Sequence, residues 1–243
     1  MAKLIVANWK MNPRTVDEEV ALAKAADVKE LAVAPPFPFL ASVSAVLRRA
    51  SLAAQDLSSE DEGAFTGEVS ASQLREFGVT YVIVGHSERR HHLAETDEVI
   101  ARKVATALKH RLTPILCVGE TREERASGGK EAVIERQLKI GLSIAGSVAK
   151  VIIAYEPLWA ISASPGAHAD TVHDTAGMVQ YIRSVLAAIG KGEAEAIIYG
   201  GSVTSKNIEE FLSYQDIGGA LVGGASLKKE EIKKIVKAAA TYE

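Results

Sequence analysis

The stretch Val151-Ile152-Ile153-Ala154-Tyr155 runs directly into Glu156-Pro157-Leu158-Trp159. A short apolar run closed by a charged residue and a proline predicts a strand that is covered on both faces, as the strands of parallel sheets are. Seven similar runs recur along the chain: Leu4 to Ala7, Leu31 to Ala34, Leu52 to Ala54, Tyr81 to Val84, Pro114 to Val118, Ala196 to Tyr199 and Ala220 to Val222. Eight such strands place the fold in the α/β class.

Helical patterns fill the segments between these runs. Apolar residues recur at helical spacing, for example Val99, Ile100, Val104 and Leu108, or Val133, Ile134, Leu138 and Leu142. Helix starts are predicted at Thr15, Thr121 and Ser205. The alternation predicts a closed (β/α)8 barrel with eight parallel strands, forming a single domain over residues 1–243 at roughly thirty residues a unit. A doubly wound open sheet is the alternative, but the first run lacks the Gly-x-Gly-x-x-Gly turn of that fold.

Composition and charge exclude several classes of function. The net charge of -3 is spread along the chain, so neither nucleic acid nor a membrane surface is an expected partner. The single cysteine, Cys117, leaves no internal disulfide and no multi-cysteine metal motif, which indicates a reducing compartment. Because no signal-peptide core or membrane-length apolar run is present, we expect a soluble cytoplasmic protein.

The residues that follow the strands are the candidates for chemistry, because the loops there converge on one mouth of a barrel. Asn8 and Lys10 follow the first strand and bring an amide and an ammonium group. Alternatively, they are a turn asparagine and a surface lysine.

His86 ends the fourth strand beside a helix start. There the helix dipole favours a neutral imidazole ring, which can donate a hydrogen bond to a substrate oxygen. The alternative is a structural histidine.

Glu156 follows the sixth strand among apolar and aromatic neighbours, where a poorly hydrated carboxylate is a competent general base. The alternative is a carboxylate paired with an arginine.

The last two strands end in Gly200-Gly201 and Gly223-Gly224, whose backbone amides can approach an anion closely, and phosphate sites in barrels commonly form there. With no cofactor fingerprint present, these groups predict proton transfer next to a carbonyl in a small phosphate ester.

Seven motifs resemble those of the triosephosphate isomerase family, in order and across essentially the whole chain. They are Asn8-Trp9-Lys10-Met11-Asn12, Gly63-Ala64-Phe65-Thr66-Gly67-Glu68, Val84-Gly85-His86-Ser87-Glu88-Arg89-Arg90, Cys117-Val118-Gly119-Glu120-Thr121, Ala154-Tyr155-Glu156-Pro157-Leu158-Trp159-Ala160-Ile161, Tyr199-Gly200-Gly201-Ser202-Val203 and Leu221-Val222-Gly223-Gly224-Ala225-Ser226-Leu227. The resemblance implies that the chain interconverts dihydroxyacetone phosphate and glyceraldehyde 3-phosphate, a step of glycolysis and gluconeogenesis, without a metal or organic cofactor.

The resemblance also implies the roles of the catalytic residues. Glu156 would move the proton between C1 and C2 of the triose, and His86 would polarise the carbonyl as a neutral ring. Lys10 would supply positive charge to the phosphate and the enediolate, and Asn8 would hydrogen-bond the reacting oxygens. Glu88 would support these groups.

Further site residues follow from the same resemblance. Cys117 would lie in the supporting shell. The phosphate would be bound by the backbone amides of Ser162, Ser202, Gly223 and Gly224. Family members usually read Gly-Thr-Gly-Lys in the lid over the site, whereas this chain has Ser162-Ala163-Ser164-Pro165 and about four extra residues before Tyr181. Because lid closure protects the enediolate, the reaction rate cannot be inferred from the family.

The longer segment from Ser162 to Asp174 carries His168, Asp170 and His173, a spacing that could hold a divalent metal together with Asp174. Polar residues are ordinary on a loop of this kind, so we expect a solvated loop and no metal.

Two other functions fit part of the pattern, since a barrel fold does not fix its chemistry. An isomerase or lyase of another sugar phosphate would keep the glycine pairs, but would have no reason to keep all four catalytic candidates. A non-catalytic phosphate-binding barrel is conceivable because the lid is altered, although the acid-base residues are intact.

The resemblance further implies a homodimer. In it, the segment around Thr66 would dock beside Asn8 and Lys10 of the partner subunit. The tip of that segment, Ser58-Ser59-Glu60-Asp61-Glu62, is acidic in this chain.

Overall fold

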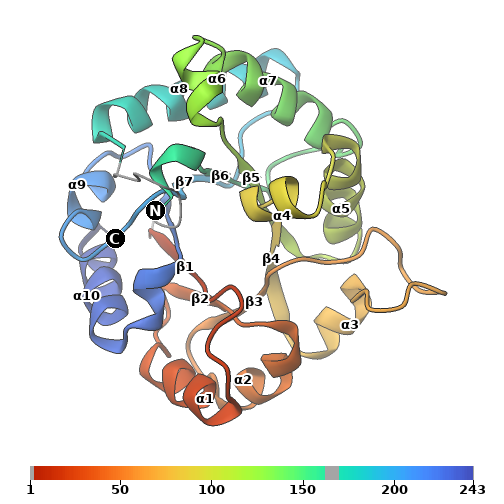
Figure 1. Cartoon of the computed structure of the whole chain (residues 1–243), viewed down its shortest axis with the longest axis vertical. Coiled ribbons are helices and arrows are strands. Elements are labelled where there is room, and N and C mark those ends of the chain that lie inside the picture. Colours follow the sequence, from red (N-terminus) through yellow and green to blue (C-terminus); the bar gives the residue numbers. More distant parts are fainter. Residues whose placement is uncertain (1–2, 162–169, 243) are drawn as a thin grey trace.

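The computed structural model describes residues 3–161 and 170–242. Its centre is a closed barrel of eight parallel strands in chain order, in which β1 also pairs with β8 (Figure 1). The strands are Leu4–Asn8 (β1), Leu31–Ala34 (β2), Ser51–Ala54 (β3), Val79–Val84 (β4), Thr113–Val118 (β5), Ile152–Tyr155 (β6), Ala196–Tyr199 (β7) and Gly219–Val222 (β8). Every predicted run coincides with a strand, so the (β/α)8 barrel is confirmed and the open sheet was the wrong alternative.

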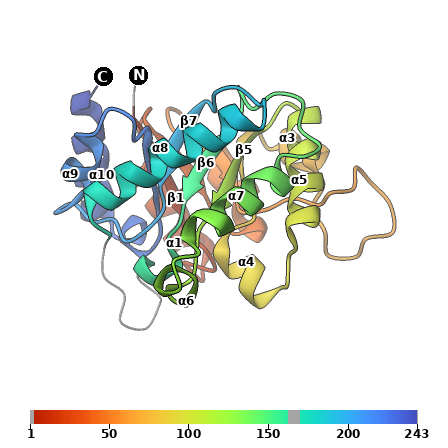
Figure 2. The same ribbon diagram turned by 90° about the horizontal axis from the view of Figure 1, so that it is seen from above.

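Helices surround the ring of strands on the outside (Figures 1 and 2). The α-helices are Val16–Ala25 (α1), Leu40–Val46 (α2), Ala71–Glu76 (α3), Ser87–His92 (α4), Asp97–Lys109 (α5), Arg122–Ala126 (α6), Lys130–Gly141 (α7), Val172–Ala188 (α8), Ile208–Leu212 (α9) and Lys229–Ala239 (α10). Short 3-10 turns lie at Phe37–Phe39 (η1), Leu158–Ala160 (η2), Gly224–Leu227 (η3) and Ala240–Tyr242 (η4). Within the described residues, no helix has the length and apolar character needed to span a membrane.

The core has two layers, because each strand is buried on both faces. Val6, Ile83 and Ile198 belong to the inner cluster that fills the barrel. Their neighbours along the strands, such as Ile5 and Val84, belong to the larger cluster between the strands and the helices. This burial on both faces explains why the strands read as continuous apolar runs rather than as alternating patterns.

Two of the three predicted helix starts are confirmed. The Thr15 side chain accepts a hydrogen bond at the start of α1, and Thr121 forms a capping box at the start of α6. The predicted start at Ser205 was wrong, since α9 begins at Ile208 with Asn207 in the cap position. The reason is that the Asn207 side chain bonds back to the preceding turn and closes it before the helix starts.

Ala94 lies between α4 and α5 with a φ of 53°, in the left-handed region that favours glycine. We expect Ala94→Gly to raise the free energy of unfolding by about 0.5–1 kcal/mol, because the strain of an alanine in that region exceeds the extra chain entropy of glycine. Urea denaturation measures the difference. The matched control is Ala126→Gly in α6, which should lower the stability by about the same amount. A loss of stability in Ala94→Gly would contradict this prediction.

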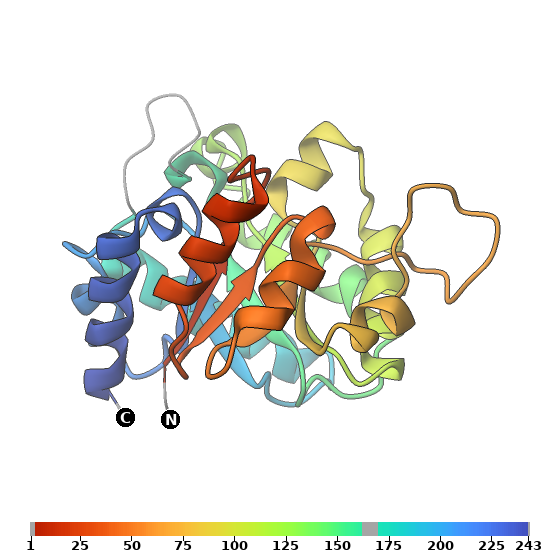
Figure 3. The same ribbon diagram turned by 90° about the horizontal axis from the view of Figure 1, so that it is seen from below.

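Different parts of the chain lie at the two ends of the barrel. Figure 3 shows both termini at one end and α4 at the other, where the carboxyl ends of the strands lie. The same view shows the connection between β3 and α3 extending away from the barrel.

Candidate active site

A cavity of about 310 Å³ lies at the carboxyl ends of the strands. The residues around it follow or end β1, β4, β6, β7 and β8. Among the predicted site residues, it brings together Asn8, Lys10, His86, Glu88, Glu156, Gly223 and Gly224. Ser162 lies outside the described residues. The closed barrel is what collects these groups, since they are distant in the sequence and share only their position at the ends of strands.

His86 and Glu156 face each other in the cavity. Nε2 of His86 lies 3.2 Å from Oε1 of Glu156, and the two residues are only 6% and 2% exposed. The other ring nitrogen, Nδ1, accepts a hydrogen bond of 3.2 Å from the backbone N–H of Glu88. A nitrogen that accepts a hydrogen bond carries no proton, so this contact assigns the hydrogen of a neutral ring to Nε2. The imidazole therefore presents an N–H donor to the cavity.

The backbone around Glu156 fixes its carboxylate. The Glu156 N–H donates to the Val118 carbonyl at 2.7 Å, and the Ser87 N–H donates to Oε2 at 3.2 Å. Among the described residues its carboxylate lies beside His86 and pairs with no arginine, so the arginine pairing considered from the sequence was wrong. A Cβ atom at Gly200 would lie 2.6 Å from Cγ of Glu156. Gly200 therefore makes room for this side chain, a role that its sequence motif does not reveal.

Lys10 is held at the cavity by its neighbours. Its Nζ lies 2.6 Å from Oε1 of Glu88. Burial acts to raise the pKa of Glu88, but the hydrogen bond and charge of Lys10 outweigh it and hold that pKa below its usual range. Oδ1 of Asn8 accepts from the Lys10 N–H at 3.0 Å, and Nε2 of Gln55 donates to the Lys10 carbonyl at 2.8 Å. Gln55 was not among the predicted site residues, although its position directly after β3 was a signal that could have identified it.

The predicted phosphate ligands do not all have free amides. Gly223 and Gly224 line the cavity, and a Cβ atom built at Gly223 would lie 3.5 Å from Cε of Lys10. The lysine stem therefore runs beside Gly223. The Ser202 N–H, in contrast, donates to the Ala160 carbonyl at 2.9 Å. It would have to leave that bond before it could bind a phosphate.

Comparison with known proteins agrees with this geometry. The family model described as triosephosphate isomerase matches residues 3–239. The chain belongs to the triosephosphate isomerase family. Proteins named triosephosphate isomerase are similar to it throughout: that of Dictyoglomus thermophilum is 42% identical, with 97% of this chain and 98% of the relative covered. Those of Cupriavidus necator and Thiobacillus denitrificans are 45% and 46% identical, with 96% and 98% of this chain and 98% of each relative covered. The resemblance drawn from the seven motifs is thus confirmed.

In this member of the triosephosphate isomerase family, Cys117 lies on β5 and is buried. Burial raises the pKa of the Cys117 thiol, and the charge of Glu156 acts in the same direction. The thiol is therefore a neutral neighbour of the carboxylate.

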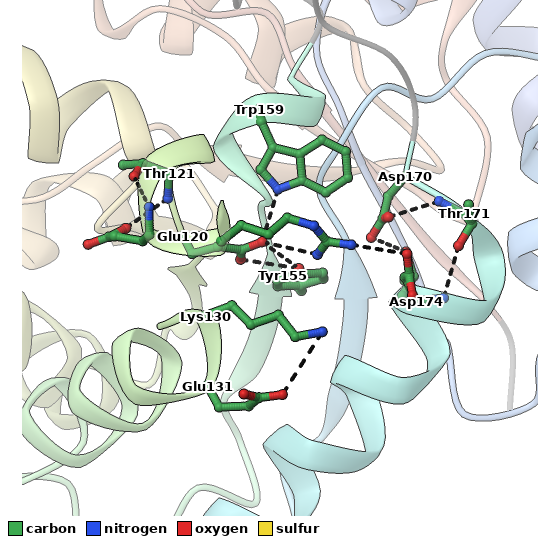
Figure 4. A network of polar contacts seen from close by, with 12 residues as sticks. Glu120, Thr121, Lys130, Glu131, Tyr155, Trp159, Asp170, Thr171 and Asp174 are labelled. Atoms are coloured by element: carbon green, nitrogen blue, oxygen red, sulfur yellow. Dashed lines mark hydrogen bonds and ion pairs between the residues drawn. The ribbon is translucent and has the colours of Figure 1, made fainter. Parts of the chain in front are cut away.

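A buried carboxylate anchors the chain after β6 (Figure 4). Glu120 has no solvent exposure and accepts hydrogen bonds from the Tyr155 hydroxyl at 3.2 Å and from Nε1 of Trp159 at 2.9 Å. The guanidinium of Arg125 lies 3.6 Å from Glu120 and stacks on the Trp159 ring, 4.6 Å from its centre. These contacts fix the segment that follows Glu156. Glu120 belongs to one of the seven motifs but was not a predicted site residue, although its position just after β5 was a signal that could have identified it.

Of the residues that the sequence offered as possible metal ligands, Asp170 and Asp174 have other partners. His168 lies outside the described residues. Asp170 accepts hydrogen bonds from the first turn of α8, and Asp174 pairs with Arg125 at 3.0 Å. In residues 3–161 and 170–242, no group of three or more histidine, cysteine, aspartate or glutamate side chains could hold a metal ion.

Proposed function

We propose that this chain interconverts dihydroxyacetone phosphate and glyceraldehyde 3-phosphate, the triosephosphate isomerase reaction of glycolysis and gluconeogenesis. The observation that carries the proposal is the 3.2 Å contact between Glu156 and His86 inside a cavity that is also lined by Gly223 and Gly224. A base and a hydrogen-bond donor at one end, with a glycine pair and a lysine nearby, suit a three-carbon phosphate ester.

The reaction is a proton transfer through an enediolate. The Glu156 carboxylate takes a proton from C1 of dihydroxyacetone phosphate, and the C–H electrons form the C1–C2 double bond. His86 donates a hydrogen bond from Nε2 to the C2 oxygen, where negative charge develops. The ammonium of Lys10 stabilises that charge, and Asn8 bonds the reacting oxygens. His86 gives its Nε2 proton to the C2 oxygen and takes the proton of the C1 hydroxyl, so the negative charge moves to the C1 oxygen. Glu156 then returns a proton to C2 as the C1–O bond becomes the aldehyde carbonyl, so the reaction needs no oxidant and no cofactor.

An assay with dihydroxyacetone phosphate tests this function directly. The purified full chain should form glyceraldehyde 3-phosphate in an enzyme-coupled assay, and a larger ketose phosphate should not react. The absence of interconversion by folded protein would remove the proposal. Turnover of the larger sugar phosphate alone would favour an isomerase or lyase of another class.

We also propose that the chain forms a homodimer through the segment around Thr66. This segment lies on the connection that extends away from the barrel (Figure 3), and Phe65 beside Thr66 is 48% exposed. Met11, which adjoins Lys10, is 89% exposed. Two exposed apolar side chains, one on the segment and one beside the cavity, support docking of the segment next to Lys10 of the partner subunit.

Thr66→Lys should break this dimer, because an added charge at the docking surface must be buried without a partner. We expect sedimentation at the monomer mass and a loss of turnover of at least tenfold. The matched control is Glu98→Lys on the exposed face of α5, which should keep both the mass and the turnover of the unaltered chain. An unaltered chain that sediments as a monomer, with full turnover, would contradict the proposal.

Residues 1–243 form a single domain in this proposal, because pairing of β1 with β8 joins the two ends of the described barrel. We place the protein in the cytoplasm, where a free and buried Cys117 is stable as a thiol.

A further inference from the structure

The first turn of α4 contacts three of the groups that the proposed reaction uses. Its cap residue is His86. The Ser87 N–H donates to Oε2 of Glu156 at 3.2 Å, and the Glu88 N–H donates to Nδ1 of His86 at 3.2 Å. The Glu88 side chain also holds Nζ of Lys10. The position of this turn therefore sets the geometry of three groups in the cavity at once.

Helix α4 is too short to hold that position by itself. It has six residues, Ser87–His92, and isolated helices shorter than about 12–15 residues are marginal in water. Contacts with the barrel must therefore fix its place. Arg90, in the second half of the helix, makes such contacts to the ends of two strands.

Arg90 extends the pairing of β4 with β5. The ladder of paired residues between these strands ends at Val84 and Leu116. The carbonyls of the next residue along each chain, Gly85 and Cys117, both accept a hydrogen bond from Arg90. Nε donates to Gly85 at 2.8 Å, and Nη2 donates to Cys117 at 3.1 Å. The guanidinium thus joins the two strands one residue beyond their last backbone pair.

The two carbonyls that it bonds belong to the peptide groups leading into the active site. The Gly85 carbonyl is joined to the nitrogen of His86. The Cys117 carbonyl is joined to the nitrogen of Val118, whose own carbonyl accepts the Glu156 N–H at 2.7 Å. Because a peptide group is planar, a hydrogen bond that fixes its carbonyl also fixes the direction in which the next residue starts. The guanidinium therefore acts on both sides of the 3.2 Å contact between His86 and Glu156.

The guanidinium is itself held in place. Its third nitrogen, Nη1, donates to Oδ1 of Asp97, whose side chain is only 4% exposed. A Cβ atom at Gly85 would lie 3.1 Å from Nη2 of Arg90 and 2.8 Å from Cδ1 of Ile100, so the glycine leaves the space that the guanidinium needs. Three nitrogens bonded in three directions require the planar fork of arginine, which the point charge of a lysine does not reproduce.

We propose that Arg90 is a positioning residue of the isomerase, which sets the distance between His86 and Glu156 by bonding the carbonyls of Gly85 and Cys117. Arg90 does not line the cavity, so it acts through these two side chains and not on the substrate. The inference rests on the proposed function, because proton transfer is what requires the base and the hydrogen-bond donor to keep their places.

Arg90→Lys tests this role by kinetics. Lysine keeps a positive charge beside Asp97 but cannot bond both carbonyls in the geometry of the fork. We expect kcat to fall at least about tenfold and KM to change less than about threefold, because a misplaced base and donor weaken the transition state and not substrate binding. The matched control is Arg136→Lys, the same change at the other arginine that bonds Asp97, which should keep both constants.

NMR of the His86 ring reads its position without any turnover. In protein labelled with 15N-histidine, the protonated and unprotonated ring nitrogens give separate signals, and those of His86 are the ones lost in His86→Gln. Arg90→Lys should shift them, because the Gly85 carbonyl is released. Arg136→Lys should leave them in place. Urea denaturation checks that each variant is folded.

Asp97→Asn serves as a second variant should Arg90→Lys fail to fold. It removes the charge that holds Nη1 but keeps the size of the side chain, so it should shift the same signals and lower kcat by a smaller factor. The proposal is overturned if the folded variants keep kcat within about threefold, if the His86 signals do not move, or if Arg136→Lys loses as much turnover. An unaltered chain without turnover would remove the proposed function alone, since the His86 signals still report the position of the ring.

Discussion

Glu156→Gln lowers kcat for dihydroxyacetone phosphate by about 10²- to 10⁴-fold and changes KM much less, as expected when a general base is removed. Glutamine matches glutamate in size, so the cavity keeps its shape. Glutamine cannot take a proton from C1, however. Because that proton transfer occurs in the transition state and not in substrate binding, its loss lowers kcat and leaves KM nearly unchanged. Steady-state kinetics with the coupled assay measures both constants.

Glu156→Asp tests whether the position of the general base matters, because this variant keeps a carboxylate but moves it. The shorter side chain keeps a carboxylate but withdraws it by one methylene from its place 3.2 Å from Nε2 of His86. We expect a smaller loss in kcat than in the glutamine variant, again with little change in KM. The control is Glu98→Gln on the surface of α5, which should leave both constants unchanged. Turnover at the unaltered rate in Glu156→Gln would mean that another residue is the base.

Glu19→Gln should stabilise the protein by a few kcal/mol at high pH. Glu19 is fully buried on α1, neither of its carboxylate oxygens has a hydrogen-bond partner among the described residues, and burial raises its pKa to about 8. One pKa unit corresponds to about 1.4 kcal/mol, so a shift from 4.5 to about 8 sets an upper limit of about 5 kcal/mol. We expect roughly 2–4 kcal/mol, because local rearrangement and water entry reduce the cost of an ionised group.

The sign of this effect depends on pH. Below about pH 4.5, Glu19 is protonated in both the folded and the unfolded chain, and it adds no pH dependence. Between about 4.5 and 8 the unfolded chain releases the proton first, so the folded chain loses stability as the pH rises. The difference between Glu19→Gln and the unaltered chain should therefore be small at pH 4 and reach its full size at pH 9.

Urea denaturation at pH 4, 7 and 9 checks this prediction. The matched control is Glu18→Gln, which changes the adjacent exposed residue of α1 and should alter the stability by less than about 0.5 kcal/mol at each pH. An equal response of the two variants to pH would show that Glu19 does not titrate as its burial requires.

The strands could be predicted from the sequence because burial on both faces leaves a local signal. Val151 to Tyr155 is apolar throughout, and so are the other runs. The positions of Asn8, His86 and Glu156 at one mouth then follow from the topology, since parallel strands of a closed barrel all end on the same side.

Side-chain contacts between residues that follow different strands leave no pattern in the local sequence, so they could not be predicted. The pairing of Lys10 with Glu88 and the space that Gly200 leaves for Glu156 depend on neighbours brought together only by barrel closure. The same holds for Ser202, whose amide is bonded to the chain after β6. Glu19 is different, because it falls on the buried face of α1 that also carries Leu22. Helical periodicity alone could have identified it as a buried carboxylate.

Conversion of dihydroxyacetone phosphate in D2O tests most directly whether Glu156 carries the proton. A carboxylate that exchanges its proton with solvent delivers deuterium to C2, so we expect glyceraldehyde 3-phosphate labelled at C2, as seen by proton NMR, and almost no labelled product with Glu156→Gln. Product formed or labelled by the glutamine variant as fast as by the unaltered chain would contradict proton transfer through this residue.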